Sequence, residues 1–151
     1  MNAIAQVIAA VNANNGVVAD DHRGAADRVI FGMATLVRGE QEVAVPLIDA
    51  RYFSINGLYI GTDGKAHIST SSVGGVVEKF ALTMDTAILN YNEGQSENMF
   101  CNSFLVDVHY LVDGKLEPVD LVTRDQVKEL QAKAKAARDK WEKEFEAKAQ
   151  A

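Results

Sequence analysis

Two histidines and an aspartate are the residues whose types and spacing could support acid–base or metal chemistry. Asp107 and His109 are separated by one residue in a segment of alternating character, so a β-strand would place both side chains on one face. His67 lies in a second such segment. Imidazole and carboxylate groups bind zinc or iron, and a hydrolase could use them for proton transfer. A half-exposed polar sheet face explains them better, so we expect no metal, cofactor or catalytic residue.

A run of hydroxyl and glycine residues, Ser69–Gly75, is the second candidate site. It precedes a predicted helix, and hydroxyls and glycine amides at a helix N-terminus can hold a phosphate or nucleotide. The ligand-binding residues of this site would be His67, Ser71, Ser72, Gly74 and Gly75. The run has no Gly-Lys-Ser/Thr sequence, so it is not a P-loop. Ordinary helix capping by Ser72 requires no ligand and is the simpler interpretation.

Residues 124–151 predict a long amphipathic helix, which carries the third candidate, an interaction surface. The segment is rich in alanine, lacks glycine and proline, and would extend roughly 40 Å. Its apolar residues recur every three or four positions, at Val127, Leu130, Ala134, Ala137, Trp141 and Phe145. This stripe is narrower than a usual core-facing surface. We expect Val127, Leu130, Trp141 and Phe145 to bind another copy or another protein. Packing of the two aromatic residues on the chain's own sheet is the alternative.

The composition is that of a folded globular domain. The chain has 151 residues, of which 48% are hydrophobic and 24% charged, so it can bury a core. Its single cysteine, Cys101, cannot form an internal disulfide, which fits a reducing compartment. No stretch reaches the ~18–20 apolar residues of a membrane span, and the N-terminus lacks the basic start of a secretory signal. We expect the cytoplasm, or a particle assembled there, and no membrane partner.

The net charge of −6 is unevenly distributed along the chain. Residues 1–123 contain seven basic and fifteen acidic residues, which gives −8, whereas residues 124–151 contain eight basic and six acidic residues, which gives +2. An acidic body repels phosphate backbones, and the mixed charges of the C-terminal segment do not reverse that repulsion. We therefore expect no binding to duplex nucleic acid.

The remaining pattern predicts an α+β domain with a mostly antiparallel sheet built of hairpins. Strands are indicated over residues 28–37, 42–48, 51–61, 66–70, 103–112 and 116–122. Asp63-Gly64 and Asp113-Gly114 are favoured hairpin turns. Pro46 indicates a strand that lies at a sheet edge or ends at a bulge, and Pro118 indicates an edge strand. Within residues 103–112, strict alternation would put Phe104, Val106, Val108, Tyr110 and Val112 on one face.

Two further helices are predicted before the C-terminal one. Residues 2–13 repeat apolar residues at helical spacing, and residues 72–91 do so over a longer stretch. Alternation around residues 80–84 keeps strands open as an alternative for the second segment. Residues 17–27 have no clear period and are predicted to be a loop. Residues 1–123 would form the globular domain, with residues 124–151 either packed on it or protruding from it.

These patterns indicate a non-enzymatic interaction or assembly protein, oligomeric through its C-terminal helix. A phage structural or accessory protein fits this description, although no residue specifies it. A small-molecule or nucleotide-binding protein using Ser69–Gly75 is the alternative. A hydrolase using His67, Asp107 and His109 is less favoured, because the sequence contains no complete catalytic constellation.

Overall fold

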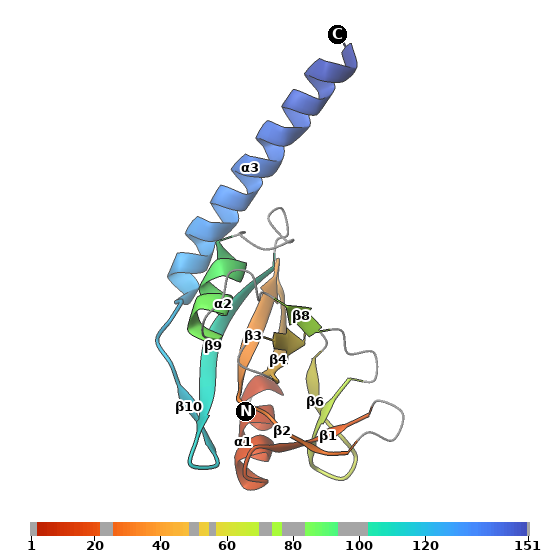
Figure 1. The fold of residues 1–151 in the computed structure, drawn as a ribbon, viewed down its shortest axis with the longest axis vertical. Coiled ribbons are helices and arrows are strands. Elements are labelled where there is room, and N and C mark those ends of the chain that lie inside the picture. The colour runs from red at the N-terminus through yellow and green to blue at the C-terminus, as the bar shows by residue number, and fades with distance from the viewer. Residues whose placement is uncertain are drawn as a thin grey trace.

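The computed structural model describes residues 3–21, 26–48, 52–54, 57–69, 74–76, 84–93 and 103–150. These residues form an α+β fold, as the sequence predicts (Figure 1). The helices are α1 (Ala3–Ala13), α2 (Met84–Asn92) and α3 (Arg124–Gln150). The strands, in chain order, are β1 (Val17–Asp20), β2 (Arg28–Val29), β3 (Gly32–Arg38), β4 (Gln41–Leu47), β5 (Tyr52–Ser54), β6 (Leu58–Ile60), β7 (Ala66–Ile68), β8 (Gly74–Val76), β9 (Ser103–Val112) and β10 (Lys115–Pro118).

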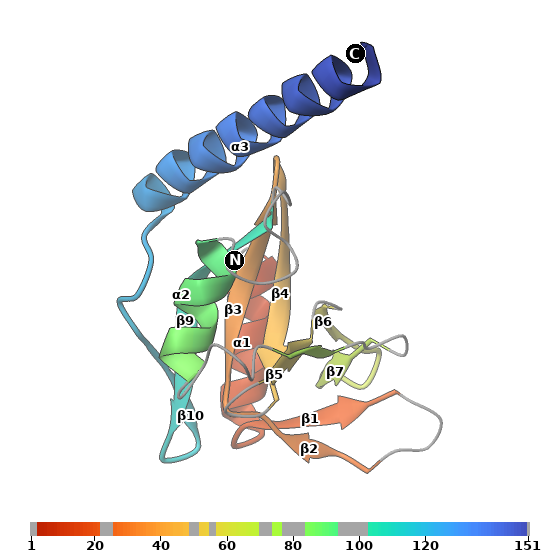
Figure 2. The same cartoon turned by 45° about the horizontal axis from the view of Figure 1, so that its top comes forward.

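The central sheet is antiparallel and has the strand order β10-β9-β3-β4. β3 is buried along most of its length, which agrees with its nearly unbroken apolar sequence. β4 and β10 lie at the two edges of this sheet, as their prolines predict. α2 covers one face, whereas α1 and the start of α3 pack on the opposite face (Figure 2). The sheet therefore provides the platform from which α3 leaves the body.

A second sheet has the strand order β2-β1-β7-β6. β6 and β7 form the hairpin that the Asp63-Gly64 pair predicts, and Gly64 has the positive φ of 78° that such a turn favours. β1 pairs with β7 in parallel. Val18 and Ile68 pack with α1, so this helix joins the two sheets through one apolar cluster.

Two sequence predictions at the N-terminal half are wrong. Residues 17–20 form β1 rather than a loop, because they pair with both β2 and β7. The predicted strand over residues 28–37 is divided: β2 belongs to the second sheet and β3 to the central sheet. Ile30 lies between the two strands, and its backbone N–H donates to the Gly16 carbonyl. Local apolar character does not show which sheet a strand joins.

The predicted helix over residues 72–91 is correct for residues 84–91 and wrong for Gly74–Val76, and its other residues lie outside the described ones. Gly74–Val76 is β8, which pairs antiparallel with β5, and the helix begins at Met84. The predicted strand over residues 51–61 is likewise divided, into β5 and β6. In both cases a long-range pairing, between β5 and β8, determines the local conformation instead of the apolar period.

The alternation of β9 is interrupted at Asp107. This residue has a φ of 50°, and the β3–β9 register shifts beside it, as at a β-bulge. Phe104 and Val106 face the start of α3, whereas Val108 packs with α2. The prediction that alternate residues from Phe104 onward share one face is therefore wrong beyond Asp107, because one inserted residue exchanges the faces.

Candidate functional site

The start of α3 is fixed by a cap and by two ion pairs. Thr123 and Gln126 form a capping box, in which the Gln126 N–H donates to the Thr123 hydroxyl (3.3 Å) and the Thr123 N–H donates to the Gln126 side chain (2.9 Å). Arg124 then donates to Glu42 of β4 and to Asp107 of β9, the second at 2.8 Å. These contacts tie the first turn to two strands of the central sheet and set the direction of the helix.

The first turns of α3 pack on the body. Val127 is 5% exposed and lies in a cluster with Val37, Phe104 and Val106. Leu130 is half-buried against the same cluster. Two of the four predicted interaction residues, Val127 and Leu130, are therefore used within the chain itself.

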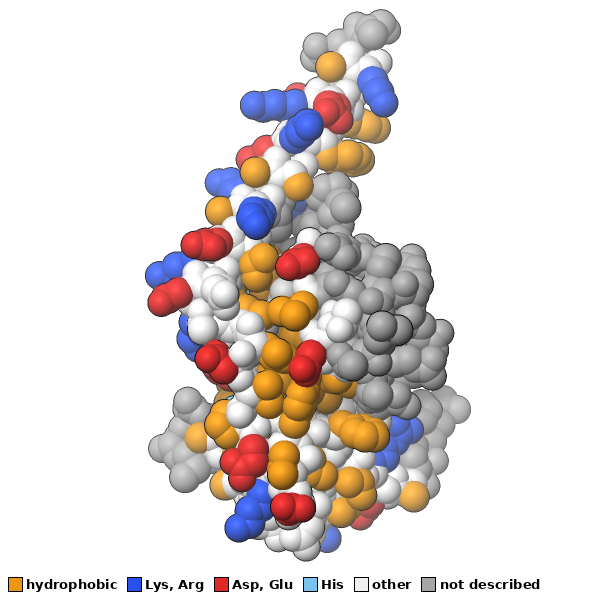
Figure 3. Space-filling model, turned by 60° about the vertical axis from the view of Figure 1, so that its left-hand side comes forward, with side chains coloured by type: hydrophobic (Ala, Val, Ile, Leu, Met, Phe, Trp, Pro, Cys, Tyr) orange, Lys and Arg blue, Asp and Glu red, His pale blue; other side chains and the backbone are white. Residues whose placement is uncertain are grey.

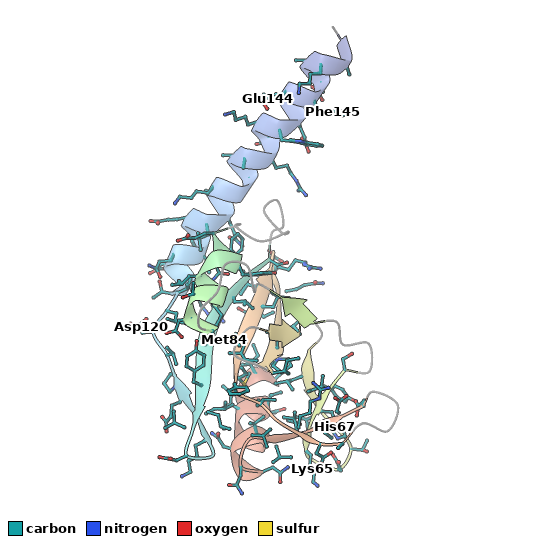
Figure 4. The ribbon with its side chains drawn as sticks, in the orientation of Figure 1. Lys65, His67, Met84, Asp120, Glu144 and Phe145 are labelled. Carbon is teal, nitrogen blue, oxygen red and sulfur yellow. The ribbon has the colours of Figure 1, made fainter. Side chains whose placement is uncertain are left out.

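The rest of α3 projects from the body (Figures 1 and 2). Beyond Gln131, every side chain that the structure describes is exposed except Ala137, which is half-buried. Trp141 is 52% and Phe145 61% exposed, and their rings stack with centroids 5.5 Å apart and an interplanar angle of 19°. Figure 4 shows Phe145 on the projecting part, far from both sheets. In the structure, neither ring packs on either sheet.

The projecting part of α3 has the properties of a docking surface. Figure 3 shows large apolar side chains on one side of it, with basic and acidic side chains over much of the remainder. We name the positions Ala134, Ala137, Trp141 and Phe145, which helical spacing places on one side, the α3 stripe. Burying a large apolar side chain contributes about 1.5–3 kcal/mol. Contact of both rings with a partner would thus supply several kcal/mol toward binding.

The second cluster of functional side chains surrounds His67 on β7. Its Nδ1 lies 2.8 Å from Asp21 Oδ1, and its Nε2 lies 3.0 Å from Asp63 Oδ1. The Tyr59 hydroxyl donates to the other Asp21 oxygen, and the Tyr59 ring stacks on His67 at 5.4 Å. Both ring nitrogens of His67 therefore face carboxylate oxygens, an arrangement that favours the protonated ring because carboxylates only accept hydrogen bonds.

These contacts shift the titration of all three charged groups. The bond to Asp21, and then the bond to Asp63, raises the pKa of His67 above its ordinary 6.5. Hydrogen bonds from Tyr59 and then His67 lower the pKa of Asp21. The backbone N–H of Lys65, followed by His67, lowers the pKa of Asp63. The cluster joins β6 and β7 to the segment that follows β1.

We expect the stabilisation from this cluster to be greatest between about pH 4 and 6.5. The contribution of His67 is fully present below its unfolded pKa and is lost as pH rises through its higher folded pKa. The contributions of Asp21 and Asp63 are present above their unfolded pKa and are lost as pH falls through their lower folded values. Urea unfolding of wild type and His67→Gln should therefore differ more at about pH 5 than at about pH 9. Equal differences would show that the ring is neutral in the folded protein.

The three residues of the less favoured hydrolase or metal-site alternative are divided between the two sheets. His67 lies on β7 of the second sheet, whereas Asp107 and His109 lie on β9 of the central sheet. Asp107 is paired with Arg124, and the His109 ring bonds the Asp107 carbonyl oxygen at 2.8 Å. Among the described residues, no group of three His, Cys, Asp or Glu residues is arranged to hold a metal ion.

The predicted anion site is only partly within the described residues. Ser71 and Ser72 lie outside them, so their predicted contacts stay predictions. Gly74 and Gly75 lie in β8, opposite Ser54 and Phe53. They are therefore not at a helix N-terminus, which removes the physical reason for expecting an anion there.

Sequence reasoning missed most residues that hold these sites together. Asp63 lies four residues before His67 in a tight turn, and this spacing could have indicated the contact. Asp21 lies 46 residues away from its partner His67, and Arg124 is far from Glu42, so no local pattern indicates either pair. In the part of the chain that the structure describes, no helix is long and apolar enough to cross a membrane.

Comparisons of this chain with protein-family models, with curated proteins and with solved structures find no match.

Proposed function

We propose that this chain is a non-enzymatic interaction and assembly protein that docks through the α3 stripe. The observation that carries the proposal is the exposure of Trp141 and Phe145, at 52% and 61%, on a helix that extends beyond its own body. Large apolar side chains grouped on one side of a charged helix are typical of a protein-binding surface. The anchoring of the helix by Thr123 and Arg124 supports this role, because a fixed helix loses less entropy when a partner binds.

The His67 cluster and the separation of Asp107 from His67 favour this function over a hydrolase. A hydrolase needs a base with a free acceptor site next to a nucleophile. His67 has both ring nitrogens bound to carboxylates. The polar residues most suited to chemistry thus have structural roles in the described part of the chain.

The test is the double substitution Trp141→Ala with Phe145→Ala. We expect the wild type, purified or in an extract of cells that express it, to migrate as an assembly larger than a 16.4 kDa monomer. The double variant should migrate as a monomer in both preparations and keep the wild-type circular dichroism spectrum, because neither ring contributes to the core. Size-exclusion chromatography with light scattering, and with immunodetection for the extract, measures this.

Asp139→Ala with Lys143→Ala is the matched control. It also places two alanines four residues apart on α3, but on the opposite side from the stripe. This variant should retain the wild-type assembly. A monomeric wild type in both preparations, or an assembly that survives loss of both rings, would show that the proposal is wrong.

A further inference from the structure

We infer that the α3 stripe binds the α3 stripe of a second copy, with the two helices antiparallel. This inference rests on the proposed function and specifies the partner and its orientation. Three properties of the described residues lead to it: the order of small and large residues along the stripe, the charges of the body and of the helix, and a groove at the base of α3.

The stripe has small residues in one half and large residues in the other. Ala134 and Ala137 lie nearer the body, and Trp141 and Phe145 lie nearer the tip. Antiparallel helices that cross between residues 139 and 140 place Trp141 against Ala137 and Phe145 against Ala134 of the other copy. Large residues then fill the space that small ones leave, as close packing requires. Parallel helices would place alanine against alanine and leave that half of the contact poorly filled.

The charge distribution also favours the antiparallel arrangement. Residues 1–123 carry −8 and residues 124–151 carry +2. Parallel helices would bring two acidic bodies together at one end, where they repel each other. Antiparallel helices place the bodies at opposite ends. They also bring residues 139–151 of each helix, which hold three basic and four acidic residues, beside residues 124–138 of the other copy, which hold five basic and two acidic residues.

A groove lies where the end of the partner helix would arrive. It has a volume of about 550 Å³ between the β3–β4 turn and the first turns of α3. Its charged and polar lining residues are Glu40, Glu42, Arg124, Asp125, Lys128 and Gln131, and Arg124 already pairs with Glu42. Lys148 of one copy and Gln131 of the other each lie about nine residues from the crossing point. The two residues therefore lie side by side along the axis of the helix pair. Lys148 thus reaches the groove beside Glu40.

The area of the contact requires this groove. A large aromatic side chain buries about 150–250 Å², so the exposed parts of the four rings supply roughly 350–550 Å² of contact. A stable interface buries about 1,200–2,000 Å², so the rings alone provide less than half. Contact of each helix end with the groove of the other copy supplies additional area on both sides of the crossing.

A spin-label distance in the purified protein tests the orientation. Ala149 is exposed near the tip, and Ala149→Cys in a Cys101→Ser background provides one label on each copy. The antiparallel dimer should give a label separation of about 30 Å, since each label lies about ten residues beyond the crossing point. A parallel dimer would give about 10 Å, the distance between neighbouring helix axes. Light scattering should give about twice the 16.4 kDa mass of one chain.

Charge exchange is the second measurement and leaves Cys101 in place. Lys148→Glu and Glu40→Lys should each raise the dissociation constant of the dimer roughly two- to fivefold per contact, and the combination should restore the wild-type value. Weakening by each single change without restoration would overturn the groove contact.

The outcomes separate this inference from the proposed function. A dimer that depends on Trp141 and Phe145 but has a short label separation overturns the antiparallel arrangement and leaves the proposed function intact. A chain that is monomeric when purified but assembles with a different protein in the extract also overturns the antiparallel dimer and leaves the proposed function intact. A dimer that persists without either ring overturns both.

Discussion

Replacing Asn92 by alanine should lower the free energy of unfolding by about 2–5 kcal/mol, because it leaves two buried backbone groups without partners. Asn92 is the last residue of α2 and is 3% exposed. Its amide donates to the Leu105 carbonyl at 2.8 Å and accepts the Leu105 N–H at 2.7 Å. β10 ends opposite His109, so the Asn92 side chain replaces a neighbouring strand at this point of β9.

The matched control for that prediction is Asn12→Ala. Asn12 accepts one hydrogen bond, from the Leu116 N–H at 2.6 Å, at a half-buried position. Its loss should reduce the free energy of unfolding by only about 0.5–1.5 kcal/mol. Urea unfolding of both variants measures the difference. Equal effects would mean that water reaches the Leu105 backbone once the amide is removed. The two hydrogen bonds of Asn92 would then stabilise the fold no more than the single bond of Asn12.

The parts of the fold that the sequence predicts are those determined by neighbouring residues. The two Asp-Gly turns indicate hairpins because positive φ is needed locally. Pro46 and Pro118 indicate edge strands because proline donates no hydrogen bond. The apolar period after Thr123 indicates α3, and its narrow width suggests a surface that its own body does not fully cover. Each of these inferences needs no knowledge of distant pairing.

The parts that the sequence does not predict depend on contacts between distant segments. β1 forms a strand because it pairs in parallel with β7. β8 forms a strand because it pairs antiparallel with β5. The bulge at Asp107 follows from the register between β3 and β9. Apolar period and residue type describe one element at a time, so they cannot show which partner it will find.

The same distinction applies to the candidate sites. The position of Trp141 and Phe145 on one side of a polar helix could be predicted, because their spacing is a local property. The contacts of His67 could not, since one of its partners, Asp21, lies 46 residues away and directly after β1. Asp107 was a candidate for chemistry, but its contact with Arg124 makes it part of the base of α3. A carboxylate beside a histidine in sequence is weak evidence for a site when its orientation depends on a bulge.

Gly32→Ala should destabilise the fold by about 3 kcal/mol or more, because β3 and β9 approach each other too closely there to admit a side chain. A Cβ at Gly32 would lie 2.1 Å from the His109 carbonyl oxygen and 3.1 Å from the Tyr110 Cα. Both atoms belong to the backbone of β9, so no side-chain rotation can relieve the overlap. The central pair of strands would have to separate, and the platform that anchors α3 would be disturbed with it.

Gly39→Ala is the matched control for this steric argument. Gly39 has a positive φ of 60°, and a Cβ there would meet no atom within 4 Å. Alanine at this position should cost about 1–2 kcal/mol, from backbone conformation alone. Both variants replace glycine by alanine, so the difference between their free energies of unfolding separates the steric effect at Gly32 from the conformational effect at Gly39. Thermal and urea unfolding measure it. If Gly32→Ala were as stable as Gly39→Ala, the strands would be further apart at Gly32 than the structure places them.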